Sequence, residues 1–324
     1  MNSRCIYYSM FVQNIGNLRY YCMVYNAMQS IESIYNGKYD LVVFYDKSID
    51  IDKFYLNDEY NIKKDFPFVK FIKSDYDTKY SLNRVRPYKH DGYMSKWYHL
   101  QKVIEMGYDH VMFLDCDTVF IKDPSELFDK YDGNNLWTLS CTDRVHDMLF
   151  PDIPNMNSGQ FILKTDKIKK KNLYKRIYSK RMLMSRIAKE KLYDKGKITD
   201  IDLSGYEYFN EQYCGQMVIM EDNIEYKELN AVEVVHPASP VNFLCDNIMK
   251  KKEPNPMYSV NLNKNGIADI TDIRSDTYII HYSSGKSVFW VDKQFRNQDL
   301  NNGYRNMYNK INNIGKETWE LLFQ

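Results

Sequence analysis

Two aspartates in the segment Phe113-Leu114-Asp115-Cys116-Asp117-Thr118 are the residues best suited to chemistry. They directly follow an apolar run, 110–114, that is typical of a buried strand. In extended chain, side chains two residues apart point the same way, so both carboxylates would face one point. Neighbouring carboxylates repel each other unless a cation lies between them, and Mg²⁺ or Mn²⁺ held there can bridge to substrate phosphates. The segment therefore predicts a metal–diphosphate site, with an ordinary turn or helix cap as the alternative.

Alternating strand-like and helix-like segments surround this pair. We predict strands over residues 5–12, 41–45, 68–72, 110–114, 157–164 and 276–281, and helices over residues 17–35, 95–106 and 165–195. Such alternation indicates an α/β fold with a mostly parallel sheet, in which ligands bind beyond the carboxyl ends of the strands. We expect one elaborated domain over residues 1–300 and a C-terminal helical extension over residues 301–324.

The stretch 96–128, which ends DHVMFLDCDTVFIKDPSELF, resembles the D-x-D region of retaining glycosyltransferases related to glycogenin and to bacterial lipopolysaccharide galactosyl- and glucosyltransferases, glycosyltransferase family 8. Three further marks follow in the family's order: Met156-Asn157-Ser158-Gly159, Glu211-Gln212, and the late segment His281-Tyr282-Ser283-Ser284-Gly285-Lys286. The resemblance spans residues 4–292. It implies a GT-A fold, which is a single Rossmann-like nucleotide-binding domain whose mostly parallel sheet is flanked by helices.

The resemblance also implies roles for individual residues. Asp115, Asp117 and His281 would bind Mn²⁺, with Mg²⁺ as the alternative ion and His236 as a rival third ligand. The catalytic group would be Glu211, Gln212 and Lys286, and the donor would contact Ser9, Tyr20, Lys96, Asn157, Ser158 and Gly285. The chain departs from the family at three places. Glu211 stands where an Asp is usual, and the spacing from Lys96 to Asp115 is slightly long. Gly285 and Lys286 follow His281 by four and five residues instead of three and six.

These roles imply a metal-dependent retaining glycosyltransferase that moves glucose or galactose from a UDP-sugar to a hydroxyl of a glycan or protein, the protein's own tyrosines included. A double displacement with Glu211 as nucleophile is the alternative mechanism. A UDP-sugar hydrolase and a degenerate carbohydrate-binding or scaffold protein are the alternative functions.

Composition limits the other classes of function. The 324 residues include 44 Lys or Arg and 43 Asp or Glu, a balance that argues against nucleic acid as the partner. Six cysteines form no C-x-x-C pair, which favours reduced thiols over zinc or disulfides. No run of 18 apolar residues occurs and the first ten residues contain no apolar leader, so we expect no transmembrane segment and a cytoplasmic location.

The basic stretch 164–197 is expected to form a solvated helix face, with an anionic membrane surface or a partner protein as the alternative. The oligomeric state is left open, a homodimer included.

Overall fold

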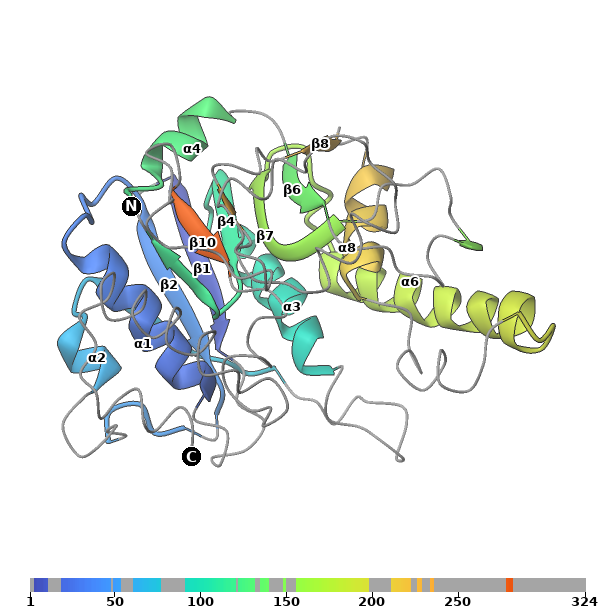
Figure 1. Ribbon diagram of the computed structural model, residues 1–324, viewed down its shortest axis with the longest axis horizontal. Coiled ribbons are helices and arrows are strands. Elements are labelled where there is room, and N and C mark those ends of the chain that lie inside the picture. Colours follow the sequence, from blue (N-terminus) through green and yellow to red (C-terminus); the bar gives the residue numbers. More distant parts are fainter. Residues whose placement is uncertain are drawn as a thin grey trace, which may run out of the picture. The chain divides into compact units, whose positions relative to one another are not determined.

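The computed structural model describes residues 3–10, 19–47, 49–53, 61–76, 91–120, 122–131, 135–139, 148–149, 156–197, 211–222, 226–228, 234–235 and 278–281 (Figure 1). Helices flank mostly parallel strands, which confirms the predicted α/β class. The chain forms two compact units: unit 1 contains residues 1–5, 76–113 and 131–228, and unit 2 contains residues 6–75, 114–130 and 229–324.

Unit 2 contains three neighbouring strands in the order β3-β2-β1. Their bounds are Arg4–Met10 for β1, whose first two residues belong to unit 1, Asp40–Tyr45 for β2 and Val69–Lys73 for β3. Strands β2 and β3 are parallel, with Leu41 opposite Val69. The helices are α1 (Arg19–Glu32), α2 (Ile62–Asp65) and α4 (Ser125–Lys130).

A second, smaller sheet in unit 2 has the order β5-β10-β9. Strand β5 is Thr118–Phe120, β9 is Val234–Val235 and β10 is Ile279–His281. Strand β10 runs antiparallel to β5 and parallel to β9. This sheet therefore joins the segment just after the D-x-D pair to a segment about 160 residues later in the chain.

Unit 1 contains four strands in the order β4-β7-β6-β8. Strand β4 is His110–Leu114, whose last residue belongs to unit 2, β6 is Asn135–Leu139, β7 is Met156–Lys164 and β8 is Tyr226–Glu228. The helices are α3 (Asp91–Glu105), α6 (Leu173–Ala188), which continues into the π-helix η2 (Lys189–Tyr193), and α8 (Glu211–Glu221). All five residues of β4 are buried, as expected for an apolar strand with covered faces.

The basic helix begins later than predicted, at Leu173 instead of residue 165. At the end of β7, the Thr165 amide donates to the Asp109 carbonyl and its hydroxyl donates to the Tyr108 carbonyl, so this residue is held beside β4. The chain then turns, and Asn172 adopts a left-handed conformation with φ 58° just before the helix. The prediction missed this turn because its lysines and Asn172 carry no strong breaker signal.

Some predicted features fall outside the described residues, namely the extension 301–324 and the boundary at residue 300. Within the described part of the chain, no helix combines the length and the hydrophobicity needed to cross a bilayer.

Candidate metal and donor site

Asp115, Asp117 and His281 converge in unit 2. One possible ligand atom from each lies within 4.8 Å of the other two. The His281 Nε2 atom is 3.3 Å from Asp117 Oδ1 and 3.8 Å from Asp115 Oδ2. The side chains of His281 and Asp117 are only 1% and 2% exposed, whereas that of Asp115 is 28% exposed. The group is therefore reached from solvent on the side of Asp115.

A turn, and not continued extended chain, brings the two aspartates together. Cys116 and Asp117 form this turn between β4 and β5. The Thr118 hydroxyl donates to the Asp115 carbonyl at 2.9 Å and thereby closes it. The extended-chain argument for the pair is wrong in this detail, because the carboxylates converge through the turn and not through the two-residue period of a strand.

Two contacts from β1 fix this turn. The Tyr8 hydroxyl lies 3.2 Å from Thr118 Oγ1 in a buried environment. Because the Thr118 proton is used toward Asp115, Tyr8 is the donor in this pair. The Cys116 thiol donates to the Ser9 carbonyl at 3.5 Å. Burial raises the pKa of Tyr8 well above its usual value, so its hydroxyl stays protonated as a donor.

Strand pairing delivers the histidine to the same turn. His281 is opposite Thr118 in the antiparallel pair of β10 and β5, one residue beyond Asp117. The Phe120 amide of β5 donates to Ser30 Oγ of α1 at 2.9 Å. Hydrogen bonds thus hold β5 to α1 on one side and to β10 on the other. The register of the β5–β10 pair then fixes the position of His281.

The donor set fits a divalent cation. Two carboxylates supply oxygen ligands and the imidazole supplies a nitrogen, which Mn²⁺ accepts more readily than Mg²⁺. An octahedral ion with ligands at about 2.1 Å separates neighbouring ligand atoms by about 3 Å. The distances of 3.3 and 3.8 Å are close to that value, so a small adjustment would suffice.

A second group of predicted residues gathers in unit 1. The Lys96 ammonium of α3 donates to Ser158 Oγ of β7 at 3.1 Å and lies 3.7 Å from Glu211 Oε1 of α8. It also lies 5.2 Å from the centroid of the Phe113 ring. The Ser158 amide donates to the Gln212 side chain at 3.4 Å. Four residues predicted from three separate motifs therefore form one polar group, of which all but the half-buried Gln212 are buried.

Gly215 allows α8 to approach α3 closely enough for this group to form. A Cβ atom at this position would lie 2.2–2.5 Å from three atoms of the Trp97 indole, closer than real contacts allow. Trp97 is fully buried and stacks on Phe161 with ring centroids 5.3 Å apart. Because Lys96 directly precedes Trp97 and Glu211 lies one turn before Gly215, this contact determines how near their side chains come.

The remaining predicted site residues divide into two sets. Ser9 lies in β1 and Tyr20 in α1, each half-buried in unit 2, and the Ser9 carbonyl contacts the D-x-D turn by accepting from the Cys116 thiol. The backbone of Asn157 belongs to β7 and pairs with Thr138, but its side chain is outside the described part. Gly285, Lys286 and the rival ligand His236 also lie outside the described residues.

Sequence reasoning missed Tyr8, Trp97 and Gly215 as residues that position these groups. Tyr8 lies within an apolar strand and Trp97 on the apolar face of a helix, so each resembles ordinary core. Gly215 was the one available signal, because an isolated glycine within a helical segment often marks a close packing contact.

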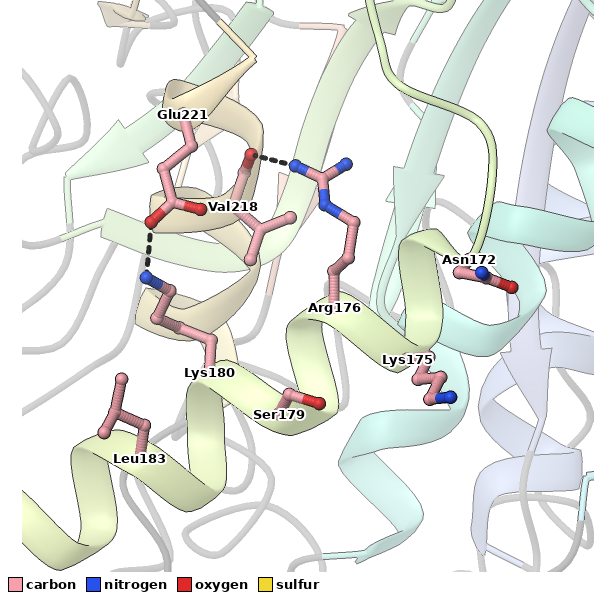
Figure 2. Close-up of a pocket in the computed structure, with 8 residues that line it drawn as sticks. All are labelled: Asn172, Lys175, Arg176, Ser179, Lys180, Leu183, Val218 and Glu221. Atoms are coloured by element: carbon pink, nitrogen blue, oxygen red, sulfur yellow. Dashed lines mark hydrogen bonds and ion pairs between the residues drawn. The ribbon is translucent and has the colours of Figure 1, made fainter.

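A groove of about 420 Å³ lies between α6 and α8 of unit 1 (Figure 2). It is lined by Asn172, Lys175, Arg176, Ser179, Lys180, Leu183, Val218 and Glu221. None of these residues belongs to the two predicted groups. The groove is therefore a separate feature of the basic helix.

Comparisons with known proteins agree with this architecture. The described structure resembles the galactosyltransferase LgtC, crystallised with donor and acceptor sugar analogues (TM-score 0.54, 13% identity, 98% of this chain and 100% of that chain). It also resembles the glycosyltransferase GlyE of Streptococcus pneumoniae (TM-score 0.51, 12% identity, 98% of this chain and 62% of that chain) and mouse xyloside xylosyltransferase 1 (TM-score 0.51, 12% identity, 87% and 98%). The chain thus spans about three fifths of the length of the pneumococcal structure.

These likenesses confirm the predicted GT-A fold. A search of curated proteins finds no match to the sequence. Residues 61–202, which contain the D-x-D pair, Lys96 and Ser158, match the family model of the nucleotide-diphospho-sugar transferases. The resemblance to nucleotide-sugar-dependent glycosyltransferases that the motifs predicted is therefore confirmed.

Proposed function

We propose that the protein is a metal-dependent, retaining glycosyltransferase that moves glucose or galactose from a UDP-sugar to a hydroxyl of a glycan or a protein. The observation that carries this proposal is the convergence of Asp115, Asp117 and His281 directly beyond β4. The family match over residues 61–202 and the fold support the donor class. A bound divalent cation, Mn²⁺ in our proposal, would neutralise charge on the leaving diphosphate.

The chain's own residues bind and orient the donor in this proposal. Lys96 offers a buried cation, already oriented by Ser158 and Glu211, to the donor sugar or its phosphates. A preoriented charge stabilises a developing anion without the reorganisation that water would need. Gln212 and Asn157 would hydrogen-bond the transferred sugar. Lys286, in the part of the chain that the structure does not describe, would neutralise the leaving diphosphate.

Retention follows if the acceptor attacks the face that the diphosphate leaves. The bond from the anomeric carbon to the phosphate oxygen breaks, the bond to the acceptor oxygen forms, and the acceptor proton passes to the leaving phosphate. No protein base is then required. The side chain of Glu211 is 11% exposed and lies 3.7 Å from the Lys96 ammonium, which suits it to hold that lysine in place. The alternative is a covalent glycosyl ester on Glu211, which mass spectrometry of the protein with donor alone would detect.

Calorimetry with UDP-glucose and UDP-galactose, with and without Mn²⁺, tests the donor site. We expect binding that requires the metal and that weakens at least about 100-fold in Asp117→Asn, since removal of a ligand should exceed the ~10–100-fold effect of an outer contact. Asp50→Asn is the matched control, because Asp50 is an exposed aspartate whose Oδ2 atom lies 3.3 Å from the exposed Lys53 ammonium. Equal binding without Mn²⁺ and in Asp117→Asn would refute the metal dependence.

Product analysis separates the other functions. Release of free sugar at the same rate with and without candidate acceptors would identify a hydrolase. Failure to bind any nucleotide sugar across a wider panel would instead indicate a carbohydrate-binding or scaffold protein. Transfer of label to a glycan or protein hydroxyl, with the anomeric configuration kept, is the outcome we expect.

A further inference from the structure

Positive charge is concentrated in residues 164–197. This stretch contains 14 Lys or Arg and three Asp or Glu, whereas the rest of the chain contains 30 and 40. A chain of almost zero net charge therefore carries a local excess of eleven positive charges. Such a separation of charge attracts an anionic surface over one region only.

The structure places many of these cations on the outside of unit 1. Helix α6 buries the stripe Leu173, Ile177, Met184 and Ala188. The 100° period of α6 puts Lys175, Ser179, Met182, Leu183 and Arg186 on one other face, and Lys189, the first residue of η2, and the exposed Glu190 adjoin its end. Lys175, Arg186 and Lys189 are exposed. We call Lys175, Leu183, Arg186 and Lys189 the basic face.

Other cations of the stretch hold α6 against α8. Arg176 donates to both carboxylate oxygens of Asp222, at 2.6 and 3.0 Å, and to the Val218 carbonyl at 3.4 Å. Lys180 pairs with Glu221, and Figure 2 shows this pair and the Arg176–Val218 contact across the groove. Asp222 and Glu221 thus pair with Arg176 and Lys180, whereas Lys175 and Leu183, which also line the groove, belong with Arg186 and Lys189 to the exposed basic face.

The exposed side chain of Leu183 among the cations favours a phospholipid surface over a nucleic acid as the anionic partner. Leu183 is 38% exposed, and half-buried Met182 lies beside it. Leu183 and Arg186 are three residues apart and therefore neighbours on the helix surface. A phosphate backbone gives such a leucine nothing to bury against, whereas the boundary between lipid headgroups and acyl chains does. Cations that flank an exposed apolar side chain suit a surface that offers both anionic headgroups and an apolar layer beneath them.

We propose that the basic face binds an anionic phospholipid surface, with Lys175, Arg186 and Lys189 against the headgroups and Leu183 inserted between them. The proposal does not depend on the donor site.

Co-sedimentation with vesicles tests it. The full chain should bind vesicles of phosphatidylcholine containing about one third phosphatidylserine, and not vesicles of phosphatidylcholine alone. The triple variant Lys175→Gln, Arg186→Gln, Lys189→Gln should bind about 100-fold more weakly, at roughly fivefold per cation. The charge-matched control substitutes glutamine for exposed lysines of unit 2, Lys38, Lys53 and Lys73, and should bind like the wild type.

A second variant tests whether the Leu183 side chain inserts into the bilayer. Leu183→Asn keeps every charge and should weaken vesicle binding several-fold, because the inserted side chain becomes polar. Equal binding by the wild type and the triple variant, or no binding to the anionic vesicles, would overturn the proposal. Binding of single-stranded RNA that Leu183→Asn leaves unchanged, without vesicle binding, would also overturn it and would assign the face to nucleic acid. Thermal unfolding and UDP-sugar calorimetry should be unchanged in all variants, which separates this result from failure to fold or to bind donor.

Discussion

Replacement of Gly215 by alanine tests whether the close packing of α3 and α8 determines the distance between the Lys96 and Glu211 side chains. In a solvent-exposed helix this change would stabilise the protein by about 1 kcal/mol, because alanine is the better helix former. Here the added carbon would lie 2.2, 2.4 and 2.5 Å from atoms of the Trp97 indole, against an ordinary carbon–carbon contact of about 3.5–4.0 Å. Something must therefore move by more than about 1 Å.

The indole itself has little room to move. Trp97 is fully buried and stacked on Phe161, which in turn stacks on Phe113 with ring centroids 5.2 Å apart. Helices α3 and α8 must therefore separate. Overpacking of this kind costs about 1–3 kcal/mol. The better helix propensity of alanine offsets about 1 kcal/mol of that cost, so we expect a net loss of about 2 kcal/mol in the free energy of unfolding. Separation would also lengthen the 3.7 Å distance between Lys96 and Glu211 and weaken donor binding.

Urea unfolding of a double-mutant cycle isolates the contact. Trp97→Phe replaces the indole by a smaller phenyl ring that does not extend to the positions of Cζ2 and Cη2, and alone it should destabilise the protein by leaving a cavity. In the Gly215→Ala background the same change should cost about 2 kcal/mol less, because the new methyl group occupies part of that space. Additive effects, or a Gly215→Ala protein as stable as the wild type, would refute the packing argument.

Two further predictions concern residues outside that contact. Tyr8→Phe should weaken Mn²⁺ binding about tenfold, because Thr118 loses the donor that helps to fix the metal turn, and should lower unfolding free energy by only about 1 kcal/mol; an unchanged Mn²⁺ affinity in calorimetry would contradict it. Arg176→Met should destabilise the protein by about 2 kcal/mol at pH 7. Burial of Asp222 opposes ionisation, but Arg176 and the Lys169 amide outweigh it and lower the Asp222 pKa, so this stability is present above about pH 4 and is lost as the pH falls through the lowered pKa. The difference in unfolding free energy between the two proteins, measured in urea, should be smaller at pH 3 than at pH 7, and a constant difference would contradict the assignment.

The elements that could be predicted from sequence are those whose signal is local. Strand β4 is a continuous apolar run and was predicted with its observed bounds, 110–114. Helices α1 and α3 carry apolar residues at helical spacing, and their ends differ from prediction by a few residues. The D-x-D pair was found because two carboxylates directly after a buried strand are unusual in any other role.

Contacts that depend on register could not be predicted. His281 reaches the aspartates through the pairing of two three-residue strands, β5 and β10, which no local pattern defines. The motif order of the family supplied this residue, and physical reasoning on the chain alone would have left His236 as an equal candidate. The Lys96–Ser158–Glu211 group likewise depends on how α3, β7 and α8 pack.

Sequence reasoning also could not identify the core residues that position the metal ligands. Tyr8 has the sequence signature of a buried strand residue, and only its hydroxyl, in contact with Thr118, links it to the metal turn. The same hydrogen-bonded chain explains why the turn needs threonine after the second aspartate: one hydroxyl must accept from Tyr8 and donate to the Asp115 carbonyl at once. Serine could make both bonds but would lose the methyl group that β-branched residues pack within strands. The threonine of the D-x-D-T motif is thus explained by its hydrogen bonds to the buried Tyr8 and to the turn. The two aspartates are explained by the metal ion that we propose they bind.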